Sequence, residues 1–260
     1  NTVLPDPQKP SNNINIKITY QYNLILANIS FLLYKFCMKI SVIVPAKGNS
    51  NRLKDKNLVK VLDHSLTEMA CEKLLRSKII NNVYLDTDSE KIIDDVLHLF
   101  NKGLKLIKRP KELANNNITA NDLIIYALHR IEKCDLILQS FVTSPLLKIE
   151  TIDKCIKEFL KKKKYDAFLT VENIKEYFWS QKGFPTNFDI NTLPNSVDLE
   201  TIYKETHGLY GIYTKSLFKN KNRFGSKTLL IETSKVEGLD INDAEDLKIL
   251  KAIMNYDKKK

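Results

Sequence analysis

The residues best suited to chemistry lie in one short segment that follows an apolar run near residue 40. Residues 45–57 combine four cationic side chains with a glycine and several small polar side chains. Lys and Arg tips, together with backbone N–H groups, hold polyphosphates in many proteins. The segment is not a Walker loop, because the G-x-x-x-x-G-K-S/T pattern is absent. Its composition fits a polyphosphate-binding loop and a solvated basic loop equally well.

Two other sets of reactive residues are less informative. Asp86 and Asp88 form an Asp-x-Asp pattern, which can hold a metal in glycosyltransferases or contain a phosphatase nucleophile. Such phosphatases place the pattern on the first strand, whereas here it follows the second. We therefore expect Asp88 to be structural or to contact the residues that bind the ligand, not the ligand itself. The four cysteines include no C-x-x-C pair and have no histidine at metal-ligand spacing, which fits a reducing cytoplasm.

The elements that must position these residues alternate between short apolar runs and segments with helical periodicity. This pattern predicts an α/β fold with a mainly parallel sheet. Strands are predicted at residues 40–44, 83–85, 104–107, 136–142, 167–171, 209–213 and 229–231. Helices are predicted at residues 65–76, 90–100, 120–132, 150–163 and 244–255. Residues 172–205 interrupt the alternation and read as an excursion from the sheet.

Charge and composition exclude several classes of protein. The 260 residues carry a formal net charge of +10, which invites a nucleic-acid hypothesis. Residues 1–37, 161–164 and 258–260 carry +2, +4 and +3, however, which leaves the remainder almost neutral. A hydrophobic content of 43% argues against wholesale disorder. We therefore expect no nucleic-acid partner.

The first 37 residues differ in character from the rest. They are rich in asparagine, and the first methionine, Met38, stands directly before the first predicted strand. Residues 18–34 are uncharged but contain five polar side chains, and a spanning helix needs about 20 mostly apolar residues. We expect no membrane segment. Our hypothesis is that residues 1–37 are a non-native or poorly ordered leader and that residues 38–260 form the catalytic domain.

Five motifs, in the same order along the chain, resemble those of the acylneuraminate cytidylyltransferases, the enzymes that make CMP-sialic acid and related CMP-nonulosonates. They are residues 45–57 (family P-A-R-G-G-S-K, then K-N), 85–89 (S-T-D), 109–114 (R-P-x-E-L-A), 143–146 (P-T-S-P-L) and 240–242 (D-I-D). Their common order is far more specific than any single motif. The resemblance implies a three-layer Rossmann-like nucleotidyltransferase fold, similar to the GT-A type, over residues 39–255.

The resemblance also implies a binding site for CTP. Lys47, Ser50 and Lys56 would contact the phosphates, and Asn57 with the backbone near Ala46 would contact the cytidine. The full set of implied nucleotide-binding residues is Ala46, Lys47, Gly48, Ser50, Lys56, Asn57, Arg109 and Thr119. Lys47 replaces the arginine of the family, so a forked contact becomes a point charge.

The same resemblance implies that Lys47, Lys56 and Asp240 are catalytic and that Asp240 and Asn242 bind Mg²⁺. From local sequence alone, Asp240 reads better as a helix cap. Asn242 stands where the family has a second Asp, so either metal affinity is weaker or Asp243 or Asp246 contributes. The implied reaction is attack of the anomeric hydroxyl of an acidic sugar on the α-phosphorus of CTP, with pyrophosphate as the leaving group.

The implied acceptor side contains Phe141, Thr143 and His207. Phe141, Val142 and Leu147 stand where the family has Gln, Pro and often Arg, and these changes remove polar partners for a nonulosonate. We therefore expect an atypical acidic sugar. Another nucleotidyl- or glycosyltransferase of similar layout, or a degenerate nucleotide-binding homologue, remains the alternative. By resemblance, residues 172–205 would mediate a homodimer.

Overall fold

The computed structural model describes residues 38–50, 52–115 and 117–258. The chain divides into two units, Asn1–Met38 and Lys39–Lys260, and the second contains nearly all of the described residues. The predictions about a leader at residues 1–37 lie outside the described residues. Within the described ranges, no helix has the length and apolar content required to cross a membrane.

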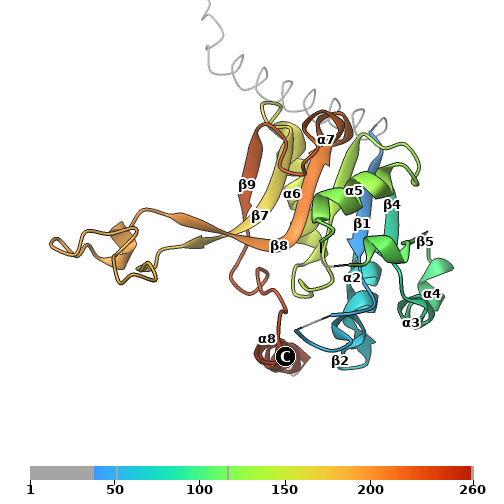
Figure 1. Cartoon of the computed structure of the whole chain (residues 1–260), viewed down its shortest axis with the longest axis horizontal. Coiled ribbons are helices and arrows are strands. Elements are labelled where there is room, and N and C mark those ends of the chain that lie inside the picture. The colour runs from blue at the N-terminus through green and yellow to red at the C-terminus, as the bar shows by residue number, and fades with distance from the viewer. Residues whose placement is uncertain (1–37, 51, 116, 259–260) are drawn as a thin grey trace, which may run out of the picture. The chain divides into compact units, whose positions relative to one another are not determined.

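A seven-stranded sheet forms the centre of the described unit (Figure 1). In spatial order its strands are β5 (Leu104–Lys108), β4 (Asn82–Thr87), β1 (Ile40–Pro45), β6 (Leu136–Gln139), β8 (Ile202–Tyr213), β7 (Ala167–Ile174) and β9 (Thr228–Glu232). β8 runs antiparallel to both of its neighbours, and the other pairings are parallel. A separate pair, β2 (Lys60–Val61) and β3 (His64–Ser65), follows the loop after β1. The predicted α/β fold with a mainly parallel sheet is confirmed.

Helices cover both faces of the sheet and make the fold three-layered. The α-helices are α2 (Leu66–Leu75), α3 (Glu90–Asp95), α4 (Leu97–Phe100), α5 (Ala120–Leu128), α6 (Ile149–Lys161), α7 (Thr214–Asn220) and α8 (Ala244–Lys258). The short 3-10 helices are η1 (Lys56–Leu58), η2 (Lys111–Leu113) and η3 (Ser196–Asp198). In Figure 1, α5 and α7 lie in front of the sheet and α6 lies behind it.

The core follows the two-residue alternation of the strands. Ile43 and Ile212 pack in one buried cluster with Ile124 of α5 and Leu217 of α7. The other face is covered by α6, where the rings of Phe159 and Phe168 lie 4.9 Å apart. Each such side chain contributes roughly 1.5–3 kcal/mol on burial.

Two helices differ from the predictions. The helix predicted at residues 90–100 is interrupted at Val96, whose backbone leaves the helical region (φ −107°, ψ 14°). Ile92, Val96 and Leu99 are all buried, at the three- and four-residue spacing from which the helix was predicted. α7 was not predicted, because its seven residues contain only two large apolar side chains, Leu217 and Phe218, and show no helical period.

The segment that interrupts the sequence pattern forms an arm. β7 and β8 continue past the sheet as a pair, with Glu172 opposite Lys204 and Ile174 opposite Ile202. Residues 175–201 form the end of this arm, which projects from the sheet in Figure 1. Its side chains include exposed aromatic rings, among them Trp179 at 53% and Phe184 at 68% exposure.

Candidate active site

A cavity of about 460 Å³ opens where β1 and β6 end. It is lined by Pro45, Lys47, Ser50, Arg52, Lys56, Asn57, Arg109, Leu123, Phe141, Val142 and Thr143. The five motifs are far apart in the chain, and three of them, those after β1, β5 and β6, contribute residues to this cavity. Ligands of open parallel sheets bind at this edge, outside the carboxyl ends of the strands. We therefore call this cavity the cleft.

Asn57 holds the loop after β1 in place. Its side chain is buried, and Nδ2 donates a hydrogen bond of 2.8 Å to the carbonyl oxygen of Lys47. The carbonyl oxygen of Asn57 accepts a hydrogen bond of 2.8 Å from Oγ1 of Thr67 on α2. The loop that carries Lys47 and Ser50 to the cleft is thus tied to a helix through one asparagine.

The backbone donors expected to wrap a phosphate have protein partners instead. The N–H of Ala46 donates to the carbonyl oxygen of Asp86 at 2.9 Å, and the N–H of Gly48 donates to Oδ1 of Asp88 at 2.9 Å. A Cβ atom at Gly48 would lie 2.8 Å from Cβ of Ser89, so close packing requires this glycine. The N–H groups of Ala46 and Gly48 are therefore hydrogen-bonded within the protein, and the Asp88 carboxylate accepts one of these bonds, as a structural residue would.

Arg109 reaches the cleft as one half of a buried ion pair. Its Nε and Nη2 donate to the two carboxylate oxygens of Asp86 at 3.0 and 2.8 Å. The side chains of Arg109 and Asp86 are 2% and 0% exposed. This forked geometry is strong and rigid, so the first Asp of the Asp-x-Asp pattern anchors Arg109. Nη1 is the guanidinium nitrogen that Asp86 does not engage.

Lys56 connects the cleft to the turn that contains Asp240. Its Nζ donates a hydrogen bond of 2.9 Å to the carbonyl oxygen of Ile241. Burial lowers the pKa of Lys56, and the nearby Asp240 carboxylate opposes that shift by stabilising the charged form. Lys56 and Asp240 therefore interact electrostatically although they are far apart in sequence.

The carboxylate of Asp240 has one oxygen without a partner. Oδ2 accepts a hydrogen bond of 2.8 Å from Nδ2 of Asn242, whereas Oδ1 is buried and has no hydrogen-bond partner among the described residues. A buried carboxylate oxygen is normally satisfied, so such an atom needs an explanation such as an ion. It fits a ligand position for a hard cation.

The neighbouring acidic residues are engaged in capping α8. Oδ1 of Asp243 accepts hydrogen bonds from the N–H groups of Glu245 and Asp246 at 2.8 and 3.1 Å. Oδ2 of Asp246 accepts from the N–H groups of Asn242 and Asp243. Asp243, rather than Asp240, is therefore the cap. Within the described ranges, no group of three or more His, Cys, Asp or Glu side chains is placed to hold a metal.

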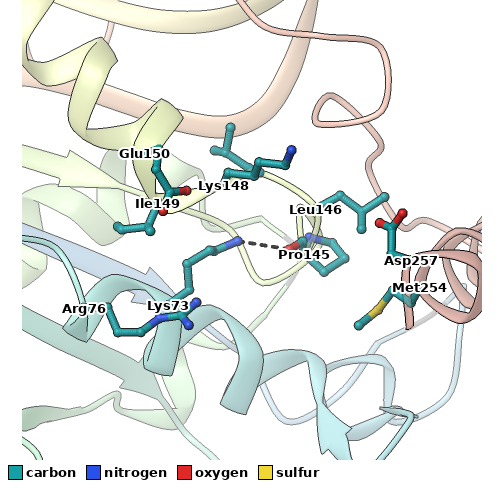
Figure 2. Close-up of a pocket in the computed structure, with 10 residues that line it drawn as sticks. Lys73, Arg76, Pro145, Leu146, Lys148, Ile149, Glu150, Met254 and Asp257 are labelled. Atoms are coloured by element: carbon teal, nitrogen blue, oxygen red, sulfur yellow. Dashed lines mark hydrogen bonds between the residues drawn. The ribbon is translucent and has the colours of Figure 1, made fainter. Parts of the chain in front are cut away.

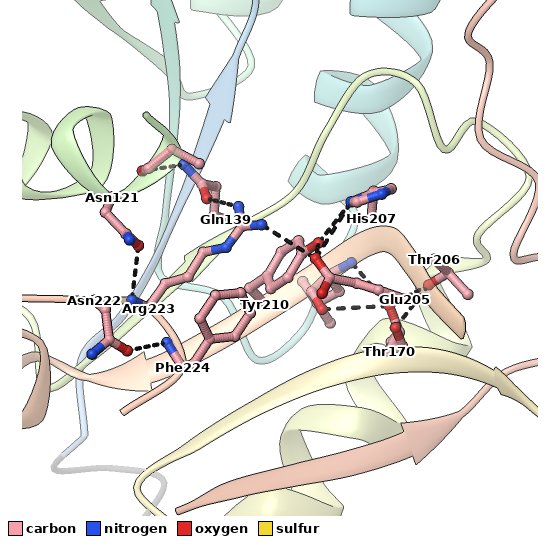
Figure 3. Close-up of polar contacts among 12 residues, drawn as sticks. Asn121, Gln139, Thr170, Glu205, Thr206, His207, Tyr210, Asn222, Arg223 and Phe224 are labelled. Carbon is pink, nitrogen blue, oxygen red and sulfur yellow. Dashed lines mark hydrogen bonds and ion pairs between the residues drawn. The ribbon is translucent and has the colours of Figure 1, made fainter. Parts of the chain in front are cut away.

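The acceptor side contains a cation that the motifs did not reveal. Arg223, from the loop after α7, lies with its guanidinium 3.7 Å from the ring centre of Tyr210 (Figure 3). The same guanidinium lies 5.6 Å from the ring centre of Phe141. Its Nη1 donates to Oε1 of Gln139 at 2.9 Å, and its Nη2 donates to Oε1 of Glu205 at 3.3 Å. A glutamine and an arginine thus lie behind Phe141, although the aligned positions hold Phe and Leu.

His207 lies at the end of the same group of side chains. Its Nδ1 is 2.9 Å from the Tyr210 hydroxyl, which donates a short hydrogen bond to Glu205. His207 has a φ of 56°, in the left-handed region that Asn and His enter more readily than most residues. Strained residues of this kind gather at functional sites. Leu147, by contrast, is 2% exposed and packs beneath Gly208.

Thr119 is the one implied nucleotide-binding residue whose side chain is committed elsewhere. It caps α5 in a capping box: its Oγ1 accepts from the N–H of Asp122 at 3.2 Å, and its own N–H donates to Oδ2 of Asp122 at 2.8 Å. Thr119 does not line the cleft. The remaining implied residues with side chains in the cleft are Lys47, Ser50, Lys56, Asn57, Arg109, Phe141 and Thr143.

The chain is similar to known proteins in sequence and in fold. The chain is 22% identical over 233 residues to the pseudaminic acid cytidylyltransferase of Campylobacter jejuni, covering 83% of this chain and 96% of that one. It is 24% identical over 218 residues to the N-acylneuraminate cytidylyltransferase of Escherichia coli O18:K1:H7, covering 81% and 51%. A solved CMP:2-keto-3-deoxy-manno-octonic acid synthetase in complex with CTP matches the fold with a TM-score of 0.61 at 13% identity, covering 84% and 99%.

The relatives differ in length. The chain spans 40–52% of several curated relatives that it matches. Residues 41–240, most of the described unit, match the sequence model of a family described as Cytidylyltransferase. The resemblance drawn from the five motifs is confirmed: the chain belongs to the cytidylyltransferase family, with the acylneuraminate and pseudaminic acid enzymes among its relatives.

Proposed function

We propose that the protein transfers CMP from CTP to the anomeric hydroxyl of an acidic, nonulosonate-type sugar and releases pyrophosphate. One observation carries the proposal. Lys47, Arg52 and Lys56 line the cleft, and the Asp240 carboxylate next to Lys56 has a buried oxygen without a partner among the described residues. Such a set of charges suits a triphosphate together with a divalent cation.

The chemistry needs positioning and charge neutralisation rather than a protein nucleophile. The anomeric oxygen attacks the α-phosphorus while the bond from that phosphorus to the bridging oxygen breaks in line. The hydroxyl proton passes to water, and pyrophosphate leaves with the bonding electron pair. Lys47 and Lys56 stabilise the charge that develops on the phosphates. The forked Asp86 ion pair keeps Arg109 rigid at the same edge.

Mg²⁺ is the cofactor that the residues present can accept. Magnesium usually takes one or two carboxylates, with phosphate oxygens and water as the other ligands. Oδ1 of Asp240 would hold it, whereas Nδ2 of Asn242 supports the same carboxylate through Oδ2. When bound, the ion would neutralise phosphate charge and orient the leaving group. On this basis Asn242 is a partner of the metal ligand, and Asp240 supplies the only carboxylate assigned to the ion.

The acceptor would meet Thr143 and Phe141 in the cleft. Arg223 lies next to Phe141, and both Arg223 and His207 contact Glu205. Arg223 is the cation on this side that could contact an acidic sugar, and its charge is partly balanced by Glu205 at 3.3 Å. Hydrogen bonds to Gln139 and Glu205 fix the orientation of its guanidinium. Fixed geometry of this kind supports selectivity among similar sugars.

Nucleotide selectivity tests the proposal against its alternatives. Purified protein is incubated with Mg²⁺, an acidic sugar panel and CTP, UTP or ATP in turn, and nucleotide-sugar product is separated by chromatography. CMP-sugar formed from CTP alone is the expected result. Product from UTP or ATP would identify another nucleotidyltransferase. Calorimetric binding of CTP without any product would identify a degenerate binding protein.

We also propose that the arm mediates a homodimer. The arm presents several exposed large apolar side chains, namely Tyr177, Phe178, Trp179, Phe184, Ile190, Leu193, Val197, Ile202 and Tyr203. Aromatic-rich patches of this kind are typical of interfaces. Sedimentation velocity should give a dimer for the full chain and a monomer for the double variant Trp179→Ser, Phe184→Ser. A monomeric parent protein would contradict this assignment.

A further inference from the structure

Lys73 is a buried cation that plays no part in the site described so far. It lies on α2 with 7% of its surface exposed, and its Nζ donates to the carbonyl oxygens of Ser144 and Pro145, each at 3.2 Å. Figure 2 shows the side chain reaching from α2 to the loop between β6 and α6. No carboxylate pairs with Lys73 in the described part of the chain. A buried ammonium without an anionic partner is costly, so its two carbonyl contacts matter.

The loop that Lys73 holds leads directly to the cleft. Thr143, one residue before the first of these carbonyls, lines the cleft, and its carbonyl oxygen accepts a hydrogen bond of 2.8 Å from the N–H of Ile241. The carbonyl oxygen of Ile241 accepts from Nζ of Lys56 at 2.9 Å. A continuous series of contacts therefore joins Lys73 to Thr143, Ile241 and Lys56.

The same helix also holds the nucleotide side. Oγ1 of Thr67, near the start of α2, donates to the carbonyl oxygen of Asn57 at 2.8 Å. α2 therefore anchors the loop after β1 near one end and the loop after β6 near the other. A single rigid helix can fix the distance between two loops more accurately than the loops themselves can.

We propose that Lys73 is a positioning residue that sets Thr143 and the turn at residues 240–241 relative to the bound nucleotide. The proposal rests on the proposed cytidylyltransferase function. It predicts that loss of Lys73 impairs turnover and acceptor use while nucleotide binding, held through Thr67 and Asn57, is retained.

The charge of Lys73 is sensitive to pH. Burial, with a smaller contribution from the nearby Arg76, lowers the pKa of its ammonium from 10.5 to about 8, although Glu237 opposes the shift. Lys73 is among the residues that line a cavity of about 470 Å³ open to solvent. The charged side chains that line the same cavity are Arg76, Lys148, Glu150 and Asp257, and Glu237 interacts electrostatically with Lys73. A neutral amine holds carbonyl oxygens more weakly than an ammonium does, so positioning should weaken as the pH rises through about 8.

Kinetics of Lys73→Met and Lys73→Arg test the proposal. We expect Lys73→Met to lower kcat about 10- to 100-fold, because small misplacements of reacting groups cost this much, with the Kd for CTP within about threefold of the parent value. The parent enzyme should lose activity as pH rises through about 8. Lys73→Arg, which keeps its charge, should lack that loss. The control Arg76→Met removes a cation from the same cavity and should keep the parent kcat at pH 7.

Hydrogen exchange provides a measurement that does not need turnover. In Lys73→Met, the amides of Leu147 and Ile241 should both exchange faster than in the parent at the same pH. In Lys73→Arg above pH 8, both amides should exchange more slowly than in the parent. The amides of α5 should be unchanged in both variants. If no sugar supports turnover, the proposed function fails and exchange still decides the role of Lys73. Unchanged exchange and kcat in Lys73→Met would overturn the proposal. An equal loss of CTP affinity and kcat would also overturn it, because it would indicate only a general role in folding.

Discussion

The two sides of the cleft use their charged residues differently. On the nucleotide side, Lys47, Arg52 and Lys56 line the cavity, and Lys56 is hydrogen-bonded to a backbone carbonyl. On the acceptor side, Arg223 and Glu205 bind each other, and both contact other side chains of the same group. Three cations on the nucleotide side thus line the space for a ligand, and a fourth, Arg109, is fixed there by its ion pair with Asp86. On the acceptor side the cation Arg223 does not line that space and is paired with Glu205.

The difference teaches that the two ligands are recognised by different means. A triphosphate carries several negative charges, so a few cations give both affinity and catalysis. An acceptor sugar carries one carboxylate and many hydroxyls, and preorganised side chains can distinguish it by shape and hydrogen bonding. Substitutions on the nucleotide side should therefore affect charge-dependent steps most, and those on the acceptor side should affect selectivity.

The largest effect is expected on the metal side. Asp240→Asn keeps the size of the side chain but removes its charge, and we expect a loss in kcat of about 1,000-fold, because a bound metal supplies several kcal/mol of stabilisation. Pyrophosphate release at saturating CTP measures it. The matched variant Asn242→Asp adds a carboxylate and should lower the Mg²⁺ concentration needed for half-maximal activity. Full activity in Asp240→Asn would refute the metal assignment.

A smaller effect is expected for the phosphate contacts. Lys56→Ala should raise the KM for CTP about 10- to 100-fold, because hydrogen bonds to charged groups are worth about 1.5–3 kcal/mol. Lys54→Ala is the control, since Lys54 is an exposed lysine of the same loop that does not line the cleft. Calorimetric titration with CTP would measure both variants. Equal weakening by the two substitutions would mean that the loop acts only through its total charge.

On the acceptor side, Arg223→Gln should raise the KM for the acidic sugar about tenfold and leave the KM for CTP unchanged, since one oriented charge contact is lost. Tyr210→Phe removes the hydroxyl that bonds to Glu205 but keeps the ring against Arg223, and it should have a milder effect. Initial rates at varied sugar with saturating CTP, and at varied CTP with saturating sugar, give the two KM values. A change in the KM for CTP alone would contradict this prediction and assign Arg223 to the nucleotide side of the cleft.

The smallest effect is expected at Thr119. Thr119→Ala should leave the KM for CTP unchanged within twofold, because the side chain caps α5 and does not line the cleft. The free energy of unfolding should fall by about 1 kcal/mol, the usual contribution of such a cap. Urea denaturation and CTP titration of one preparation give both numbers. A large loss of CTP affinity would restore the role that the family resemblance implies.

Most of the fold could be predicted from local sequence. Buried parallel strands are short apolar runs, and residues 40–44 and 83–85 show this clearly. The limits of β7 and β8 could not be found this way, because both strands continue into the polar arm, where Glu172 lies opposite Lys204. Pairing between strands, rather than the residue types in each, extends them.

The candidate site was predictable only in part, for a related reason. The basic loop after β1 is contiguous, so its composition indicates a phosphate site without any fold. Gln139 and Arg223 are 84 residues apart, and only the fold brings them together. The hydrogen bonds from the N–H groups of Ala46 and Gly48 to Asp86 and Asp88 are likewise tertiary, so the motif alone does not reveal them.

The central claim is tested most directly by pyrophosphate release from CTP and Mg²⁺ with a panel of nonulosonates, each compared with its carboxamide. We predict release that requires both CTP and a free sugar carboxylate, with one or a few panel members strongly preferred. Release of pyrophosphate without an acidic sugar, or equal release with the carboxamides, would contradict the account.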